Sequence, residues 1–318
     1  MLQARRADAV LLLVALVWGS SYLAAKTAVD VLPVLVVLFA RYLLSAAVCL
    51  PLTAARARHR RFTRDEIRVG GVLGLTQAAV LVLETYGVAH TSAANAGLII
   101  SLTIVLTPLL DRASGGGRLP ARFFAATGLC LLAVGLLMSG SGFHALRGGD
   151  ALMLAAALVR AVHVALVGRL TAGRAVRPAH LTTVQTVVGT AVFAVPAASG
   201  LPSLVEADAA VWAQLGYLAL FCSVFAFLAQ TWAVQRGSAS RASLLLGTEP
   251  VWAAAVGVGL GGERFTVLAG VGAALMVAGT YWAQAIERAH RGGPPDGTPQ
   301  RNGRTAPVPS GRDPSRVT

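Results

Sequence analysis

The chain has 318 residues, of which 55% are hydrophobic and 13% charged, and its formal net charge is +13. Soluble domains carry about 25% charged residues, so this composition cannot cover two soluble domains with a water-facing surface. A strongly basic chain can bind nucleic acid, but here the basic residues lie between apolar segments, which argues against that class. The composition therefore predicts an integral membrane protein.

Ten apolar segments follow one another, each close to the roughly 20 residues that cross a bilayer as a helix. Helices are expected because unpaired backbone groups are costly in lipid and the segments lack the alternation of membrane β-barrels. Arg5 and Arg6 precede the first segment, but no cleavage region follows it, so it is expected to be retained. The predicted spans are roughly 8–28, 33–54, 68–89, 92–110, 121–140, 150–168, 180–199, 212–233, 241–260 and 266–286.

The first two segments carry polar side chains, which are costly in lipid and usually have a function there. Trp18, Ser21, Tyr22 and Lys26 follow a spacing of three to four residues and share one helix face. This face either lines a cavity or lets Lys26 extend to the outer interface. Arg41 lies too deep in the second segment to reach water easily. We expect it to pair with a carboxylate, with backbone carbonyl groups or with an anionic substrate.

Later segments add further polar groups. Glu84 lies near the outer end of the third segment, where it is either part of a site or merely solvated. In the sixth segment Arg160 and His163 are three residues apart, which permits a joint polar site. The ordinary pKa of histidine also suits proton transfer. Neutral hydrogen-bonding groups are added by two further side chains, Gln185 and Gln230.

Glu249 directly precedes Pro250 near the middle of an apolar segment. Pro250 removes one backbone hydrogen bond and can loosen the helix, and interrupted helices mark the binding sites of transporters. Glu249 either loses and regains a proton, or neutralises a cationic group, during a transport cycle, or it is structural, through a pair with Arg41 or by capping freed backbone groups. The candidates for proton coupling are therefore Glu249, Glu84 and His163.

The segment around Glu249 occurs twice. Residues 92–119 align without a gap with residues 238–265 at a constant offset of 146, and residues 8–12 match residues 150–154 at an offset of 142. Such a match indicates an internal duplication. We expect a first five-span copy at 1–140, a second at 150–287, and a Pro-, Gly- and Arg-rich disordered cytoplasmic tail at 288–318.

Five spans per copy is an odd number, so the second copy must insert upside down relative to the first, as in many transporters. Basic residues predict the orientation, because Lys and Arg concentrate in cytoplasmic loops. With a cytoplasmic N-terminus, the inner loops and the tail hold 22 of the 27 basic residues, and the outer loops hold only Lys26, Arg147 and Arg264. Both termini are therefore expected in the cytoplasm.

Several of these residues, in this order, resemble a known family. Trp18-Gly19-Ser20-Ser21-Tyr22, Pro33, Arg41 and Glu249-Pro250 followed by Gly262-Glu263 resemble the EamA-type branch of the drug/metabolite transporter superfamily, over about residues 8–286. The resemblance implies ten helices with cytoplasmic termini and, usually, export of amino acids, metabolites or drugs. The chain departs from the pattern at Glu84, where Gln would be expected, and in the first copy at Thr103-Ile104, which stands for Glu249-Pro250.

The sequence thus predicts an all-α, polytopic membrane protein with ten transmembrane helices in two inverted repeats. Its expected function is secondary transport of small metabolites by alternating access in the cell membrane, most simply as an exporter. An intramembrane enzyme or a non-transporting membrane scaffold is the alternative. The expected partners are a small-molecule substrate and the lipid bilayer, with a homodimer left open and no nucleic acid. The expected substrate cavity consists of Trp18, Ser21, Tyr22, Arg41, Arg160, His163, Gln185, Gln230 and Glu249.

No catalytic residues, metal or cofactor are predicted. Cys49, Cys130 and Cys222 are scattered through apolar segments without a CxxC or His–Cys spacing, which indicates neither a metal site nor a disulfide framework. The chain contains no P-loop motif, so transport driven by ATP hydrolysis in this chain is not expected.

Overall fold

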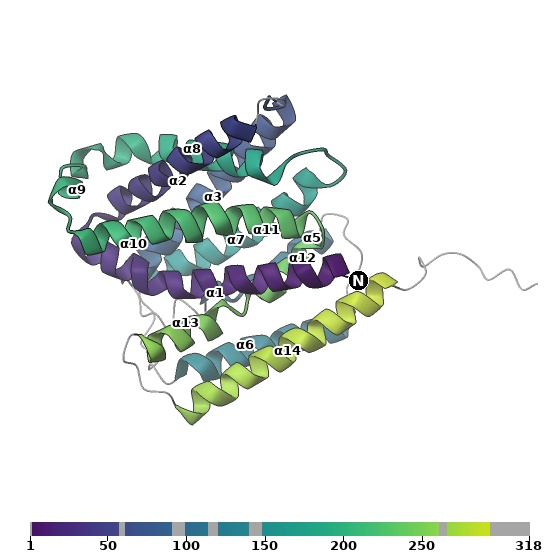
Figure 1. The fold of residues 1–318 in the computed structure, drawn as a ribbon. Coiled ribbons are helices and arrows are strands. Elements are labelled where there is room, and N and C mark those ends of the chain that lie inside the picture. Colours follow the sequence, from purple (N-terminus) through teal and green to yellow (C-terminus); the bar gives the residue numbers. More distant parts are fainter. Residues whose placement is uncertain are drawn as a thin grey trace, which may run out of the picture.

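The computed structural model describes residues 2–56, 61–90, 99–113, 120–139, 148–260 and 266–292. Within these ranges every regular element is helical (Figure 1). The apolar runs form helices because a helix satisfies its backbone hydrogen bonds within one segment. The main helices are α1 (Leu2–Val31), α2 (Val34–Arg56), α3 (Arg64–His90), α5 (Thr103–Ala113), α6 (Ala121–Ser139), α7 (Gly148–Thr171), α8 (Pro178–Ala197), α10 (Ala209–Ala219), α11 (Ala226–Val234), α12 (Ala239–Leu246), α13 (Glu249–Gly259) and α14 (Val267–Gly292).

Six helical stretches are long and apolar enough to cross a membrane: 5–31, 34–55, 64–90, 148–171, 178–200 and 209–234. The apolar stretches in α6 and α14 are shorter, at 121–136 and 270–283. The expected class, an all-helical multi-pass membrane protein, is confirmed.

Two of the predicted spans are not continuous helices. In the span predicted at 92–110, α5 begins only at Thr103, and residues 91–98 lie outside the described ranges. The span predicted at 241–260 is divided between α12 and α13 at Gly247–Thr248. At the other end of the chain α14 continues to Gly292, past residue 288, where the tail was expected to begin. The rest of that segment, 293–318, is outside the described residues.

The N-termini of three helices are fixed by local hydrogen bonds. α3 begins with a capping box, in which Thr63 Oγ1 accepts from the Glu66 backbone and Glu66 Oε2 accepts from the Thr63 backbone. Asp208 caps α10, and Ser238 caps α12. These caps fix where the chain re-enters the bundle after each loop.

The helices of the two copies pack mainly against each other. α2 packs against α8, α6 against α14, and α3 against both α7 and α8, while α1 contacts α10, α11 and α13. Figure 1 shows α6 and α14 side by side as a separate layer, with the start of α1 and the end of α14 at the same end of the bundle. We call this end the termini side. α1 runs from the termini side to the far end and α2 runs back, so α3 also begins on the termini side.

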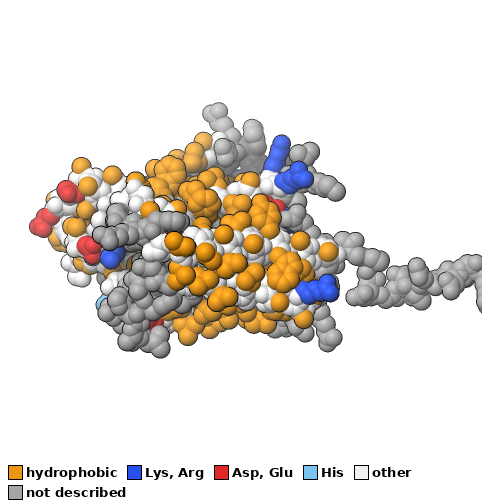
Figure 2. All heavy atoms as spheres, turned by 90° about the horizontal axis from the view of Figure 1, so that it is seen from below, with side chains coloured by type: hydrophobic (Ala, Val, Ile, Leu, Met, Phe, Trp, Pro, Cys, Tyr) orange, Lys and Arg blue, Asp and Glu red, His pale blue; other side chains and the backbone are white. Residues whose placement is uncertain are grey.

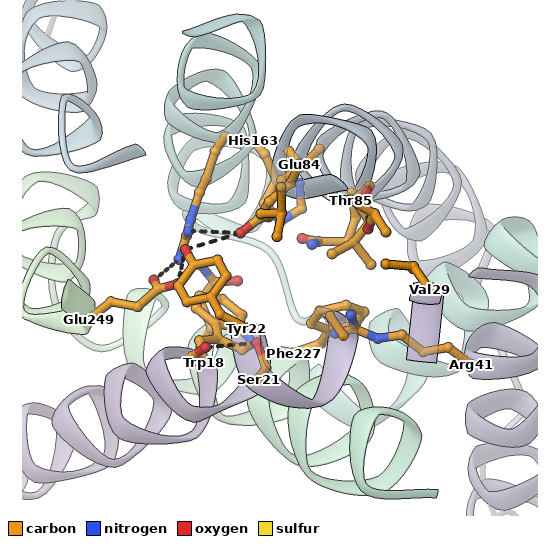
Figure 3. A pocket seen from close by; sticks show the side chains of 17 residues that line it. Trp18, Ser21, Tyr22, Val29, Arg41, Glu84, Thr85, His163, Phe227 and Glu249 are labelled. Atoms are coloured by element: carbon orange, nitrogen blue, oxygen red, sulfur yellow. Dashed lines mark hydrogen bonds and ion pairs between the residues drawn. The ribbon is translucent and has the colours of Figure 1, made fainter. Parts of the chain in front are cut away.

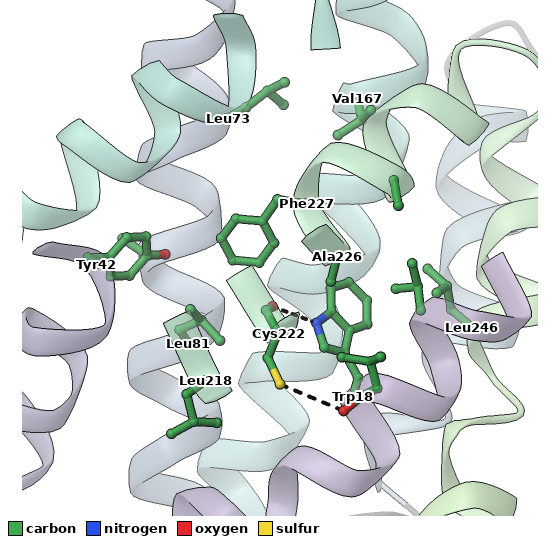
Figure 4. Packing of buried hydrophobic residues seen from close by; sticks show 14 of the residues in the cluster. Trp18, Tyr42, Leu73, Leu81, Val167, Leu218, Cys222, Ala226, Phe227 and Leu246 are labelled. Carbon is green, nitrogen blue, oxygen red and sulfur yellow. Dashed lines mark hydrogen bonds between the residues drawn. The ribbon is translucent and has the colours of Figure 1, made fainter. Parts of the chain in front are cut away.

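The interior is apolar around a short π-helical segment, Leu220–Phe225, that joins α10 to α11. The π geometry leaves backbone carbonyls available to other partners. The Cys222 carbonyl accepts a hydrogen bond from Trp18 Nε1 at 2.9 Å, and Trp18 lies beside Ala226 in the same cluster (Figure 4). The bond from Trp18 thus joins α1 of the first copy to the second copy.

The outer surface carries many apolar side chains (Figure 2). Leu13, Leu75, Leu132 and Trp282 are among the large hydrophobic residues that are exposed. In the view of Figure 2 the Lys and Arg side chains gather mostly on the termini side and the acidic ones mostly at the opposite end, with the apolar surface between them. Such a belt is what a bilayer requires.

Candidate functional site

A cavity of about 640 Å³, counting its mouth, lies between helices of both copies (Figure 3). α1, α2 and α3 line it from the first copy, and α7, α11 and α13 from the second. Its walls consist of Trp18, Ser21, Tyr22, Ala25, Val29, Arg41, Gln77, Val80, Leu81, Glu84, Thr85, Val88, Arg160, His163, Phe227, Gln230 and Glu249.

The cavity extends from mid-bundle towards the end opposite the termini side. Val29 lies in the last turn of α1 and Val88 in the last turn of α3, and both line the cavity. Trp18 and Gln77, near the middle of the same two helices, line its deep end. No residue from the first turns of α1 or α3 is among those lining it, so among the described residues the cavity reaches only one side.

Arg160 is the charged centre of the cavity. Its Nη2 lies 2.5 Å from Glu249 Oε2, and its Nη1 lies 3.8 Å from Glu84 Oε1. The guanidinium carbon is also 4.7 Å from the centre of the Trp18 ring, within cation–π distance. The Tyr22 hydroxyl donates to Glu249 Oε1 at 2.7 Å and lies 3.3 Å from Glu84 Oε1. One arginine therefore holds two carboxylates contributed by α3 and α13.

The position of Glu249 depends on the break between α12 and α13. α12 ends at Leu246 and α13 begins at Glu249, with Pro250 in the first turn of α13, where a missing backbone N–H costs nothing. Pro250 therefore begins a helix rather than loosening one. The Glu249 carboxylate therefore lies in the first turn of α13, directly after the break.

A glycine on α1 permits the close approach that brings α13 to the cavity. A Cβ atom on Gly19 would lie 2.6 Å from the Glu249 carbonyl oxygen and 2.8 Å from the Ala253 backbone nitrogen. Real side chains do not tolerate such distances, so only glycine fits between these two helices. This explains a glycine beside Trp18, where the sequence pattern alone gave no reason for one.

Arg41 lies at the other end of the cavity, away from Glu249 in Figure 3. Its Nε donates to Ser223 Oγ at 2.7 Å and its Nη2 to the Cys222 carbonyl at 3.1 Å. Both acceptors belong to the π-helical segment, so Arg41 is held by neutral oxygen atoms. Of the partners expected for Arg41, a backbone carbonyl is the one found among the described residues, whereas Glu249 pairs with Arg160.

The structure brings most of the expected site residues together. The cavity walls include Trp18, Ser21, Tyr22, Arg41, Arg160, His163, Gln230 and Glu249, together with Glu84 from the proton-coupling set. His163 Nδ1 lies 2.8 Å from Thr76 Oγ1, which accounts for one ring nitrogen by an ordinary hydrogen bond. Gln185 is buried in α8 but does not line the cavity. Lys26 is exposed and does not line it either.

Sequence reasoning missed the apolar and weakly polar parts of the wall. Ala25 and Val29 lie seven and eleven residues after Trp18, on the helix face already singled out, so helical periodicity could have identified them. No comparable signal marks Thr85 or Phe227, because their residue types are ordinary in an apolar helix.

On the termini side, ion pairs join the two copies. The Glu66 side chain is fully buried and contacts two residues of the second copy. Arg177 donates to it from Nε at 2.8 Å and from Nη2 at 3.0 Å, and His180 Nδ1 lies 3.0 Å from Oε2. The hydrogen bond to Glu66 raises the pKa of the Arg177 side chain. We call Glu66, Arg177 and His180 the Glu66 cluster.

A second ion pair joins Asp8 of α1 to Arg241 of α12, also on the termini side. Together with the Glu66 cluster it connects the copies at the end that the cavity does not reach. Metal binding has little support from the side chains, since nowhere in the described ranges do three His, Cys, Asp or Glu residues gather as a metal site would require.

Comparisons with known proteins agree on the class. The model of the EamA-like transporter family matches the chain twice, at residues 5–139 and 147–283. A protein of Archaeoglobus fulgidus described as an uncharacterized transporter is 26% identical over 271 residues, covering 85% of this chain and 83% of that protein. A solved crystal structure with 18% identity has a TM-score of 0.72 and covers 88% of this chain and 99% of that one, which shows a shared fold.

Proposed function

The chain belongs to the EamA-like transporter family, and we propose that it is a secondary transporter that moves a small metabolite across the cell membrane by alternating access. The direction favoured by the family resemblance is export, with amino acids, metabolites or drugs as the range of substrates. The cavity carries the proposal. It lies between the two copies, reaches only one side among the described residues, and buries charged groups that are costly in a membrane unless they have a function.

Two arrangements support an inverted relation between the copies. At the sequence offset of 142, Trp18 of the first copy corresponds to Arg160 of the second, and these two side chains contact each other in the cavity. Residues related by a two-fold axis can touch only near that axis. The second helices of the copies, α2 and α8, also pack together, and so do the fifth, α6 and α14. The axis would then pass through the cavity, as in inverted-repeat transporters.

Alternating access requires the termini side to open when the far end closes. The Glu66 cluster and the Asp8–Arg241 pair link the copies on the termini side, so they would have to separate in the opposite conformation. The bundle described above then corresponds to the conformation open to the outside, provided that the termini are cytoplasmic.

The proposed orientation is tested by reporter fusions at two loops. A phosphatase fused after Ser203 should be active, because that loop is expected outside, and a fluorescent protein fused after Arg60 should fluoresce inside the cell. The reverse result at either site would contradict ten spans with cytoplasmic termini.

Transport itself is tested by counterflow in vesicles that contain the purified protein. Vesicles are preloaded with one unlabelled compound from a set of amino acids, organic acids and cationic drugs, and entry of the labelled compound is followed. We expect saturable exchange of at least one compound that protein-free vesicles lack. Folded protein that exchanges none of them would instead favour an intramembrane enzyme or a non-transporting scaffold.

A further inference from the structure

The two cations of the cavity differ in how they are compensated. Arg160 contacts two carboxylates, Glu84 and Glu249. Arg41 has only the neutral oxygens of Ser223 and Cys222, and within the described ranges no carboxylate lies within 4.0 Å of its guanidinium group. The Glu84 carboxylate of the same cavity lies beyond that distance, and a buried cation with no anion in direct contact is costly. Arg41 thus has unused capacity for an anion.

The geometry of Arg41 favours binding over a purely structural role. Its side chain is only slightly exposed and lines the cavity, so it cannot extend to the membrane surface. Ser223 and the Cys222 carbonyl hold Nε and Nη2. Among the described residues nothing accepts a hydrogen bond from Nη1, the remaining nitrogen. The π-helical segment therefore fixes the guanidinium group in orientation and leaves donors for a ligand, as is common where π segments occur at functional sites.

We propose that Arg41 binds the carboxylate of the transported substrate, which is a small organic acid with a single negative charge and an apolar body. This inference rests on the proposed transport function and assigns its substrate class. Arginine presents parallel N–H groups that match a carboxylate, and a charge-assisted bond of this kind is stronger than a neutral one. A doubly charged phosphate would need a second uncompensated cation, but Arg160 is already held by two glutamates.

The apolar part of the cavity wall indicates the rest of the substrate. Val80, Leu81, Val88 and Phe227 provide apolar surface, and Trp18 adds an aromatic ring. An aromatic or branched aliphatic body would bury its surface here, while Arg41 fixes the acid group at one end. A substrate amine would compete with Arg160 for the two glutamates, which already share this cation.

Charge balance links this subsite to proton movement. Two arginines and two glutamates make the empty cavity neutral when all four are ionised. A bound carboxylate adds one negative charge, which a proton on a glutamate would cancel. The ionisable groups that face Glu249 are Tyr22 of α1, Glu84 of α3 and Arg160 of α7, with His163 and Arg41 elsewhere in the same cavity.

The substrate class is tested by binding of three matched probes to purified protein in lipid nanodiscs. 3-Phenylpropionate, 3-phenylpropanol and 3-phenylpropylamine share a body and differ in charge. Binding is measured by the change in tryptophan fluorescence and, separately, by the shift in the unfolding temperature. We expect the wild type to bind the acid most tightly. Arg41→Gln should weaken acid binding by about tenfold to a hundredfold and leave alcohol binding unchanged.

Unchanged alcohol binding shows that the Arg41→Gln cavity is intact, because a purely structural role for Arg41 would impair all three probes alike. Arg41→Lys keeps the positive charge but lacks the planar guanidinium group with its parallel N–H donors. This variant should retain part of the preference for the acid. The proposal is overturned if no probe binds, if the amine or alcohol binds best, or if Arg41→Gln keeps the preference for the acid. Because binding is measured without a membrane gradient, these outcomes leave the counterflow test of transport unaffected.

Discussion

Transport driven by a pH gradient is expected to fall to the level of protein-free vesicles when Glu249 is replaced by glutamine. Glu249 lies 2.5 Å from Arg160 and accepts a hydrogen bond from Tyr22, and it is the carboxylate placed at the helix break. Glutamine has the shape of the protonated acid but cannot release a proton. The variant should therefore remain in the proton-loaded form, in which exchange of substrate against substrate continues while net coupled transport stops.

The measurement compares uptake with and without an imposed pH gradient, and counterflow in the same vesicles. Glu206→Gln is the matched control, because Glu206 is an exposed glutamate outside the cavity. If Glu249 were only structural, Glu249→Gln would lower the yield of folded protein while the remaining molecules transported normally. Wild-type pH dependence in Glu249→Gln would reject coupling through this residue and leave Glu84 and His163 as candidates.

The second large effect is expected from Glu66→Gln, which weakens the contact between the copies on the termini side. The Glu66 side chain is fully buried and is held by Arg177 and His180. Breaking a buried ion pair costs about 3–5 kcal/mol, and glutamine can keep part of the hydrogen bonding. In the proposed cycle these contacts form only when this end is closed, so a loss of even about 1.4 kcal/mol shifts the ratio of the two conformations tenfold towards opening on the termini side.

This shift is measured by the labelling of one cavity position from each side of the membrane. Gln77 lines the deep end of the cavity, so Gln77→Cys is introduced after the three buried native cysteines are replaced by alanine. We expect an impermeant maleimide to reach position 77 from the termini side at least about tenfold faster in Glu66→Gln than in the parent.

Asp65→Asn is the control for this experiment, because Asp65 is exposed and has no hydrogen-bond partner among the described residues. Equal labelling from the termini side in parent and Glu66→Gln protein would show that the Glu66 cluster does not control access. The unfolding temperature of each variant is recorded as well. A lower unfolding temperature with unchanged labelling would assign the cluster to fold stability alone.

The structure corresponds to one conformation of the proposed transport cycle. In it the cavity reaches the far end, the Glu66 cluster and the Asp8–Arg241 pair connect the copies at the termini side, and Glu249 is paired with Arg160. Substrate and proton sites then share one space near the proposed two-fold axis. A change in the charge of Glu249 can thus alter the contacts of α1, α3 and α7 at once, because Tyr22 and Arg160 each contact both Glu249 and Glu84.

The sequence by itself determined the class of the protein, because hydropathy and charge act segment by segment. Long apolar runs predicted membrane helices, which the structure confirms, and the duplicated segments agree with the two matches to the family model. It also identified most polar residues of the cavity, since a charged or polar group in an apolar helix stands out regardless of its neighbours. The inverted arrangement of ten spans remains a prediction.

Only the tertiary structure decided which of these residues act together. Glu249 pairs with Arg160 rather than with Arg41, and Gln185 lies outside the cavity, although by sequence they were equivalent candidates. The π-helical segment that holds Arg41, and the burial of Glu66, were likewise not predicted. The reason is physical: periodicity fixes which side chains share a face of one helix, whereas pairing depends on how each helix is rotated and how closely it approaches its neighbours. At Gly19 the close approach is possible because glycine has no side chain, and a hydropathy pattern does not reveal such a requirement.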